Sequence, residues 1–313
     1  MLLCLHRMIT LSHHSSLHHH NLPLQNFFRP PSSSKRSNTR AAAASSSSMQ
    51  SFPHLQPSHR DLMSDLLSAV EARLGPTLLP SSVPPDVLSF SNQQGTSQGA
   101  LDIRSGAPDS AVDFILQSWL HCKVPIGDLN ITTLFAFLNA SVDAPHLVLE
   151  FIQGGPTSLI LLMDLIPRKD LVLHPEYLDE IYDKTHLDKR RQALARLPQV
   201  SPYISSSLYI RSVLSPTAIS VNIDCGGEGE SGIEEIILLH VGPAAKDIVG
   251  IWLDLCTSRT RDLGEAERAE MVRRDTLIKN KTVEIDLAAN LPRLFGSDVV
   301  DRIVREIQKA FRI

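Results

Sequence analysis

The chain has few of the residues that build several common kinds of site. Its 313 residues include four cysteines, and no two of them form a Cys-x-x-Cys pair. This spacing argues against a disulfide framework and against a sulfur-ligated metal cluster. Long apolar runs are also missing, since "SLILLMDLI" at 158–166 is shorter than the roughly 18 residues of a membrane helix and contains Asp164. We therefore expect no membrane span.

Acidic residues are absent from the N-terminal part of the chain, where Asp61 is the first. Serine, histidine, asparagine and scattered basic residues dominate residues 1–48, a composition typical of organelle transit peptides. We expect 1–48 to be a disordered transit peptide, with an inconsequential tail as the alternative, and 49–313 to form one domain. Removing 1–48 moves the formal net charge from −4 to −9. With this negative charge, residues 49–313 are a poor candidate for nucleic-acid binding.

Motifs for bound cofactors are weak. "GEGESG" at 227–232 matches the dinucleotide pattern Gly-x-Gly-x-x-Gly, but Glu228 and Glu230 would set negative charge against a pyrophosphate. We interpret this stretch as a solvated turn. Outside the histidine-rich N-terminus no histidines show metal-ligand spacing, and no Walker loop or Gly-x-Ser-x-Gly elbow appears.

The hydrophobic periodicity predicts an antiparallel sheet covered by helices. Helices are expected at 56–74, 174–197, 233–241, 243–256 and 297–313. Short apolar runs predict strands at 99–105, 111–124, 129–139, 146–153, 158–166, 206–215 and 218–224, with a strand or loop at 283–296. "GGPT" at 154–157 favours a hairpin between two of these strands.

Carboxylates interrupt three of these apolar stretches. Glu150 lies in "HLVLEFIQ", Asp164 lies across the expected hairpin, and Glu284 and Asp286 would share one face of a strand in "VEIDL". Alternation places Glu150 on a semi-polar face of its strand, opposite a plain core face. The residues alone leave two interpretations open. These carboxylates are either ion-paired or solvated, or one is desolvated in a pocket, where a raised pKa lets it donate a proton near neutrality.

Several segments carry a resemblance to a known family: "PPDV", "SWLHCK", "LNIT", "LVLEFIQ", "RKDLVLHPEYL", "SPTA", "GPAAK" and "LPRLFG". From about residue 52 to its end, the chain resembles red chlorophyll catabolite reductases, relatives of the ferredoxin-dependent bilin reductases. The resemblance implies a three-layer α/β/α sandwich with a central, mainly antiparallel sheet. It also implies reduction of a methine-bridge double bond of red chlorophyll catabolite, an open-chain tetrapyrrole, to primary fluorescent chlorophyll catabolite. Reduced ferredoxin would supply the electrons, and no cofactor would be bound.

The resemblance also assigns roles to residues. The family's pocket acids fall on Glu150 and Asp286, which are expected to donate protons or position the substrate. Leu214 is expected in the pocket wall that influences which face of the bridge is reduced, with a plain core leucine as the alternative. Arg168 and Lys169 are expected to bind the substrate's propionate, with a solvated turn as the alternative.

Partners and location follow from the same resemblance. Plant-type ferredoxin is acidic, so a basic patch is expected, either "DKRR" at 188–191 or the basic residues from Arg273 to Lys281, unless these are only solvated faces. The upstream oxygenase of chlorophyll breakdown and a second copy of the chain are further candidate partners. We expect the chloroplast stroma, with mitochondria as a second compartment. A non-catalytic tetrapyrrole-binding protein is the rival hypothesis, and a nicotinamide dehydrogenase is a distant third.

Overall fold

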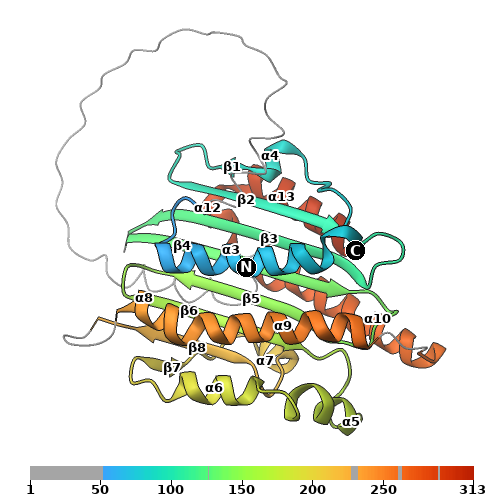
Figure 1. Ribbon diagram of the computed structural model, residues 1–313. Helices are drawn as coiled ribbons and strands as arrows, with labels where there is room; N and C mark the ends of the chain where they lie inside the picture. Colours follow the sequence, from blue (N-terminus) through green and yellow to red (C-terminus); the bar gives the residue numbers. More distant parts are fainter. Residues whose placement is uncertain (1–51, 126, 227–231, 260–262, 288–289) are drawn as a thin grey trace, which may run out of the picture.

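The computed structural model describes residues 52–125, 127–226, 232–259, 263–287 and 290–313. They form one eight-stranded sheet in the order β1-β2-β3-β4-β5-β6-β8-β7, in which every neighbouring pair is antiparallel (Figure 1). The strands are β1 (Phe90–Ser91), β2 (Ser97–Ser105), β3 (Val112–Val124), β4 (Gly127–Leu138), β5 (His146–Gln153), β6 (Ser158–Ile166), β7 (Val200–Pro202) and β8 (Ile219–Asp224). The expected transit segment, 1–48, lies outside the described residues.

The hairpin expected between the strands of Glu150 and Asp164 is confirmed. β5 and β6 pair antiparallel, with Glu150 opposite Leu162. Gly154 donates its N–H to the Ser158 carbonyl at 3.2 Å, and Gly155 has a φ of 143°, which only glycine adopts readily. The turn therefore fixes the register of the two central strands.

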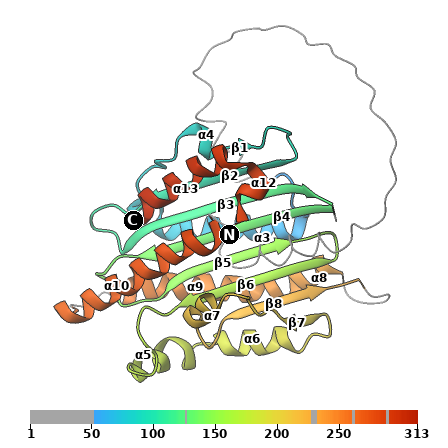
Figure 2. The ribbon, with the colours of Figure 1, turned by 180° about the vertical axis from the view of Figure 1, so that it is seen from behind.

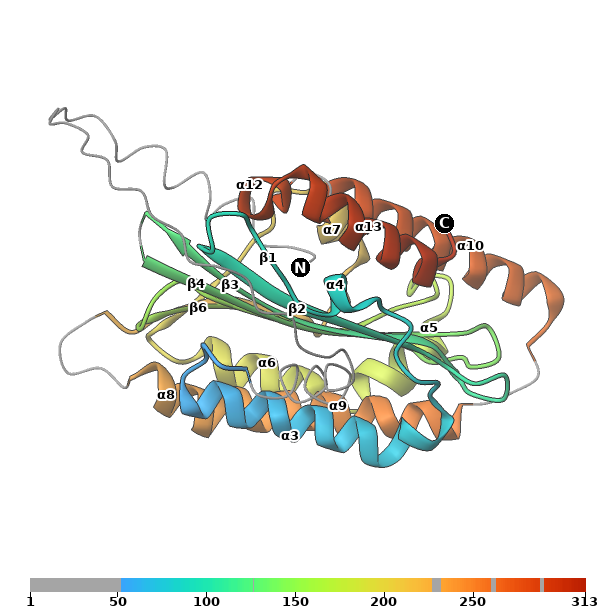
Figure 3. The ribbon, with the colours of Figure 1, turned by 90° about the horizontal axis from the view of Figure 1, so that it is seen from above.

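One helix layer covers the face of the sheet to which Leu147, Leu149 and Phe151 point. It contains α3 (Pro57–Leu74), α6 (Leu187–Ala195), α8 (Ile233–Ile236) and α9 (Gly242–Ser258) (Figure 3). α3 and α9 lie side by side on this face and run roughly along the strands (Figure 1). This side of the sheet is a large apolar core, and the buried indole of Trp252 donates to the Pro145 carbonyl at 3.2 Å within it.

A second helix layer covers the opposite face, to which Val148, Glu150 and Ile152 point. It contains α4 (Pro85–Leu88), α7 (Leu208–Val213), α10 (Glu265–Thr282), α12 (Pro292–Phe295) and α13 (Ser297–Phe311) (Figures 2 and 3). Phe114 stacks on Phe137 with ring centroids 5.0 Å apart, and Phe311 of α13 packs against both. The expected three-layer α/β/α sandwich is thus confirmed.

Five further short helical elements among the described residues lie between or extend the longer ones. They are η1 (Gly75–Thr77), α5 (Pro175–Leu178), η2 (Asp179–Asp183), η3 (Ile237–Val241) and η4 (Val283–Leu287). The continuous stretch Ile233–Ser258, which spans α8, η3 and α9, is long and apolar enough to cross a membrane by length and composition alone. Over half of its most apolar window (56%) is buried in the fold, as in the core helix of a globular domain.

Two sequence predictions of local structure are wrong. The stretch 206–215 was expected to be a strand but contains helix α7, because Ser207 caps it by accepting the Ile210 N–H at 3.3 Å. The stretch from Val283 was expected to be a strand or loop, yet it continues α10 as the π-helical turn η4. Val283 and Leu287 are buried four residues apart, which is a helical spacing, so Glu284 and Asp286 do not share a strand face.

Candidate functional site

Glu150 lies at the centre of the sheet, on the face covered by the second helix layer, and is 1% exposed. Thr133 stands opposite it on β4, and Ser118 stands opposite Thr133 on β3. Directly paired residues of an antiparallel sheet point to the same side. A carboxyl and two hydroxyls, all buried, therefore form a polar row across three strands within an otherwise apolar face.

The alternation predicted for β5 is confirmed, but its second face is more deeply buried than a semi-polar wall implies. Val148 and Ile152, the neighbours of Glu150 on that face, are at most 1% exposed. A carboxyl in such surroundings is costly unless it has a partner or a task.

Leu214 lies on the same side of the sheet. It follows α7 and borders a small cavity of about 20 Å³ between α7, α10, η4 and the sheet. Val148 of β5, Ile166 of β6 and Ile285 of η4 border the same cavity. The structure thus brings Leu214 and the strand of Glu150 together with η4, whose backbone carries Asp286; the Asp286 side chain lies outside the described residues.

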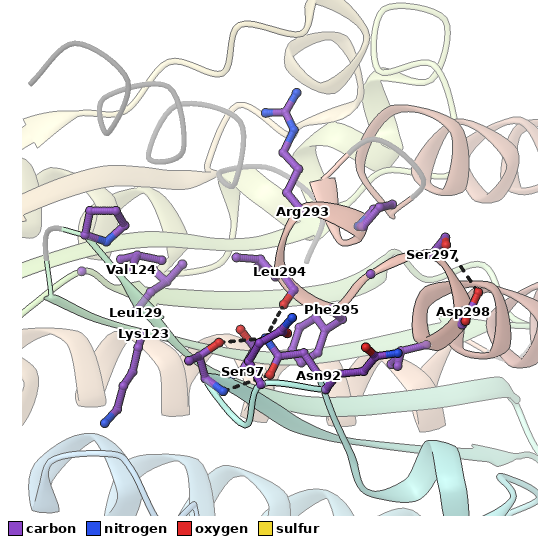
Figure 4. A pocket seen from close by; sticks show the side chains of 18 residues that line it. Asn92, Ser97, Lys123, Val124, Leu129, Arg293, Leu294, Phe295, Ser297 and Asp298 are labelled. Carbon is purple, nitrogen blue, oxygen red and sulfur yellow. Dashed lines mark hydrogen bonds between the residues drawn. The ribbon is translucent and has the colours of Figure 1, made fainter. Parts of the chain in front are cut away.

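A cleft of about 630 Å³ opens at the end of this sheet face (Figure 4). Its walls come from the β1–β2 and β3–β4 turns and from α12, and Val124, Leu129 and Leu294 are among the lining residues. The Asn92 side chain fixes one wall, since its Oδ1 accepts the N–H groups of Thr96 and Ser97 at 2.9 and 3.1 Å and its Nδ2 donates to the Leu294 carbonyl. The volume falls within the roughly 300–1,000 Å³ of typical ligand sites.

Residues 58–309 match the family model of red chlorophyll catabolite reductase (RCC reductase). The chain belongs to the red chlorophyll catabolite reductase family. This membership places it among the reductases of chlorophyll breakdown.

Curated relatives agree with that family. The chain is 52% identical over 261 residues to red chlorophyll catabolite reductase 1, chloroplastic, of Oryza sativa subsp. japonica, which covers 83% of this chain and 79% of the rice protein. It is 47% identical over 266 residues to red chlorophyll catabolite reductase, chloroplastic, of Arabidopsis thaliana, which covers 84% and 83% of the two chains. The identity to the Hordeum vulgare reductase is 54% over 202 residues, or 64% of this chain and 98% of that protein.

A solved structure shares the fold of this reductase-family chain. It is tomato phytochromobilin synthase in complex with biliverdin, with a TM-score of 0.64, 16% identity, and coverage of 81% of this chain and 84% of that one. At 16% identity this similarity shows a shared fold and nothing further.

Arg168, one of the two cations expected to bind a propionate, is held by the protein itself. It is 1% exposed and donates to both carboxyl oxygens of Asp275 on α10, at 2.6 Å from Nη2 to Oδ2. His146 of β5 contacts the same carboxyl at 2.8 Å through Nε2, while its Nδ1 accepts the Leu138 N–H. Burial opposes ionisation of Asp275, but His146 and Arg168 outweigh it and hold its pKa well below the usual range.

Lys169, the second expected cation, is also paired. Its Nζ lies 2.8 Å from Asp143 and 2.5 Å from Glu267 of α10, and the residue is 6% exposed. Arg168 and Lys169 border a separate cleft of about 680 Å³ between α7 and α10. Their contacts tie α10 to the sheet, so the structure gives both cations a structural role and does not single them out for substrate.

Asp164, which interrupts the apolar stretch at 158–166, lies in the same site. It stands opposite Val148 in the β5–β6 pair and therefore on the face of Glu150. Burial raises its pKa to about 6, although hydrogen bonds from Ser215 and from the Leu165 backbone act in the opposite direction. Its position in an apolar strand was visible in the sequence, but its partner lies 51 residues away.

The cofactor motifs of the sequence fall in two parts of the chain. "GEGESG" falls almost wholly on residues outside the described part of the chain, which resumes at Gly232. Among the residues that the structure describes, no group of three or more histidines, cysteines or carboxylates is placed to hold a metal ion.

Proposed function

We propose that this protein reduces one methine-bridge double bond of red chlorophyll catabolite to give primary fluorescent chlorophyll catabolite, with ferredoxin as the electron donor. The observation that carries the proposal is the family match over residues 58–309, supported by relatives of 47–54% identity that bear the reductase name. The relatives named chloroplastic support a location in the chloroplast, for which we propose the stroma, with 1–48 as the transit peptide.

The reaction adds two electrons and two protons across one carbon–carbon double bond. Ferredoxin delivers one electron at a time, so a radical must be held between two transfers, and each electron is balanced by one proton. We assign the protons to Glu150 and Asp286. Glu150 in its acid form would give a proton to a bridge carbon, become a carboxylate, and regain its proton from solvent.

The surroundings of Glu150 support this role. The carboxyl lies among apolar side chains, with the hydroxyls of Ser118 and Thr133 in the same row across the sheet. Water is largely excluded there, which protects a radical intermediate from side reactions. Leu214 and Ile285 would form the wall against which the flat tetrapyrrole rests once the cavity of about 20 Å³ beside them widens to admit it. The 630 Å³ cleft would hold the part of the substrate that extends toward solvent.

The propionate and ferredoxin sites are less well defined. Arg168 and Lys169 have carboxylate partners, so a propionate role for them requires those pairs to open. In the basic stretch 188–191, Arg190 pairs with Asp247 at 2.5 Å and Arg191 with Asp188 at 2.7 Å. Such pairing reduces the positive field that would attract an acidic ferredoxin.

An anaerobic assay tests the proposal. Purified protein lacking residues 1–48 is mixed with red catabolite and chemically reduced ferredoxin, and the fluorescent product is followed. Oxidised ferredoxin and a nicotinamide donor serve as controls. Product formation only with reduced ferredoxin is expected. Catabolite binding without turnover would instead support the non-catalytic binding protein, and turnover with the nicotinamide donor alone would overturn the donor assignment.

A further inference from the structure

Asp164 is a buried acid for which the proposed reaction has no use. It is 2% exposed and lies one strand away from Glu150, on the same face of the sheet. Among the residues that the structure describes, no lysine or arginine lies within ion-pair distance of its carboxyl. Its side-chain oxygens are instead held by the backbone and hydroxyl of Ser215, with a further contribution from the Leu165 backbone.

The carboxyl of Asp164 holds Ser215 at two points. The Ser215 N–H donates to Oδ2 at 2.8 Å, and the Ser215 hydroxyl donates to Oδ1 at 2.5 Å. The same hydroxyl oxygen accepts the Thr217 N–H at 3.1 Å, which shapes the connection from α7 to β8. Hydrogen bonds to an ionised acceptor are stronger than neutral ones, and two of them fix direction as well as distance.

Ser215 directly follows Leu214, the residue at the wall of the site. α7 ends at Val213, and Leu214 leaves it with extended backbone angles, φ −68° and ψ 147°. Ser215 is the next residue along the chain, so fixing it on Asp164 also fixes the backbone position from which Leu214 reaches the cavity that Val148 and Ile285 border.

We propose that Asp164 is a positioning residue of this site, which clamps Ser215 and thereby fixes Leu214 as the wall facing the substrate. The inference rests on the proposed function for its effect on catalysis, whereas the clamp itself does not depend on the reaction. Reduction of a substituted methine bridge creates a new stereocentre, and the wall decides which face of the bridge receives the proton. A loosened wall would thus change the product as well as the affinity.

Stability alone does not account for an acid at this position. Burial raises the pKa of Asp164 to about 6, above its ordinary value of 3.8. A carboxyl shifted in this direction favours the fold while protonated, and this contribution is lost as the pH rises through about 6. At neutral pH the ionised, buried carboxyl destabilises the fold, and the two hydrogen bonds from Ser215 offset part of this cost.

The experiment compares Asp164→Ala, Asp164→Asn and Ser215→Ala with wild type. Asn can accept the Ser215 N–H and donate its amide to the hydroxyl, so it should preserve the clamp, while Ala leaves two buried donors unpaired. Tyr182→Phe is the matched control. It removes a buried hydrogen bond of 2.7 Å to the carbonyl of Leu165, which lies on β6 like Asp164, but Tyr182 packs on the opposite face of the sheet.

Two readouts are taken. Amide hydrogen exchange over residues 208–218 should accelerate about tenfold or more in Asp164→Ala, less in Ser215→Ala, and little in Asp164→Asn and Tyr182→Phe. With catabolite, Asp164→Ala should raise KM about tenfold and yield a mixture of product epimers, with kcat changing less than KM.

The outcomes separate the two proposals. Wild-type exchange over 208–218 in Asp164→Ala would overturn the clamp, whatever the catalysis. Accelerated exchange with wild-type KM and epimer ratio would overturn the positioning role. A wild-type protein that does not turn over would count against the proposed function, while the exchange data would still decide the clamp.

Discussion

The two faces of strand β5 differ although they belong to the same eight residues. Leu147, Leu149 and Phe151 meet α3 and α9 in an apolar core. The other face sets His146 and Glu150 among apolar neighbours. Both are equally buried, so burial does not distinguish them.

The two faces differ in the free energy of burying their side chains. Leu147, Leu149 and Phe151 gain stability from leaving water, whereas His146, and Asp164 on the neighbouring strand β6, must recover a desolvation penalty through their partners. His146 recovers it through Asp275, and Asp164 does so only in part through Ser215. We infer that the first face stabilises the fold and that the second is built for the site.

The largest effect should come from Glu150→Gln, which keeps the shape but removes the acidic proton. General acid catalysis is worth about 10²–10⁴-fold, so single-turnover reduction should slow by about 10²-fold or more while catabolite still binds. Asp286→Asn should behave similarly, and the two losses need not add. Melting temperature is measured on the same samples; near-normal turnover per folded molecule in both variants would leave these acids without a catalytic role.

A second large effect, on the free energy of unfolding, should come from breaking the buried cluster of His146, Arg168 and Asp275. Asp275→Asn leaves Arg168 buried with a weaker partner, and losing one member of a buried pair costs about 3–5 kcal/mol. Urea unfolding measures the loss. The control is Asp188→Asn, in the half-exposed pair with Arg191, which should cost less than about 1 kcal/mol. Equal losses in the two variants would contradict a special role for the cluster.

Leu149→Ala tests the core face next to Glu150. Its side chain is fully buried, and removing such a leucine typically costs about 2–5 kcal/mol. Unfolding in urea should show this loss, while turnover per folded molecule at low temperature stays within about threefold of wild type. A large fall in turnover with little loss of stability would contradict the assignment of this face to stability and of the opposite face to the site.

The smallest effect is a pH dependence from Asp164. Since its folded pKa is raised from 3.8 to about 6, its contribution to stability is present below about pH 4 and is lost as the pH rises through about 6. A rise in pKa from 3.8 to about 6 corresponds to about 3 kcal/mol at most. Stability measured from pH 4 to 7.5 should fall less steeply in Asp164→Asn than in wild type; parallel curves would mean that Asp164 does not titrate in this range.

The sequence predicted those parts of the fold that depend on local pattern. The period-two alternation of β5, the turn at 154–157 and the helix ending at Leu74 are all present. The errors arose where one local interaction outweighed the apolar pattern. A serine cap made 208–213 helical, and the buried pair Val283 and Leu287 extended α10 into η4.

The site was harder to predict because its contacts join distant residues. Glu150 was identifiable as a carboxylate in an apolar strand, and its burial agrees with that expectation. The partners of Arg168 and Lys169 are 107 and 98 residues away, at Asp275 and Glu267, and no spacing in the chain indicates such pairs. Asp164 and Ser215 are separated in the same way.

The outermost strands of the sheet have a consequence for self-association. β1 is two residues long and β7 three, and β7 ends at Pro202, which has no N–H to offer a further strand. Short edges of this kind discourage growth of the sheet from one molecule into the next and protect against aggregation through unpaired backbone. A homodimer in which the sheets of two subunits join edge to edge is therefore disfavoured.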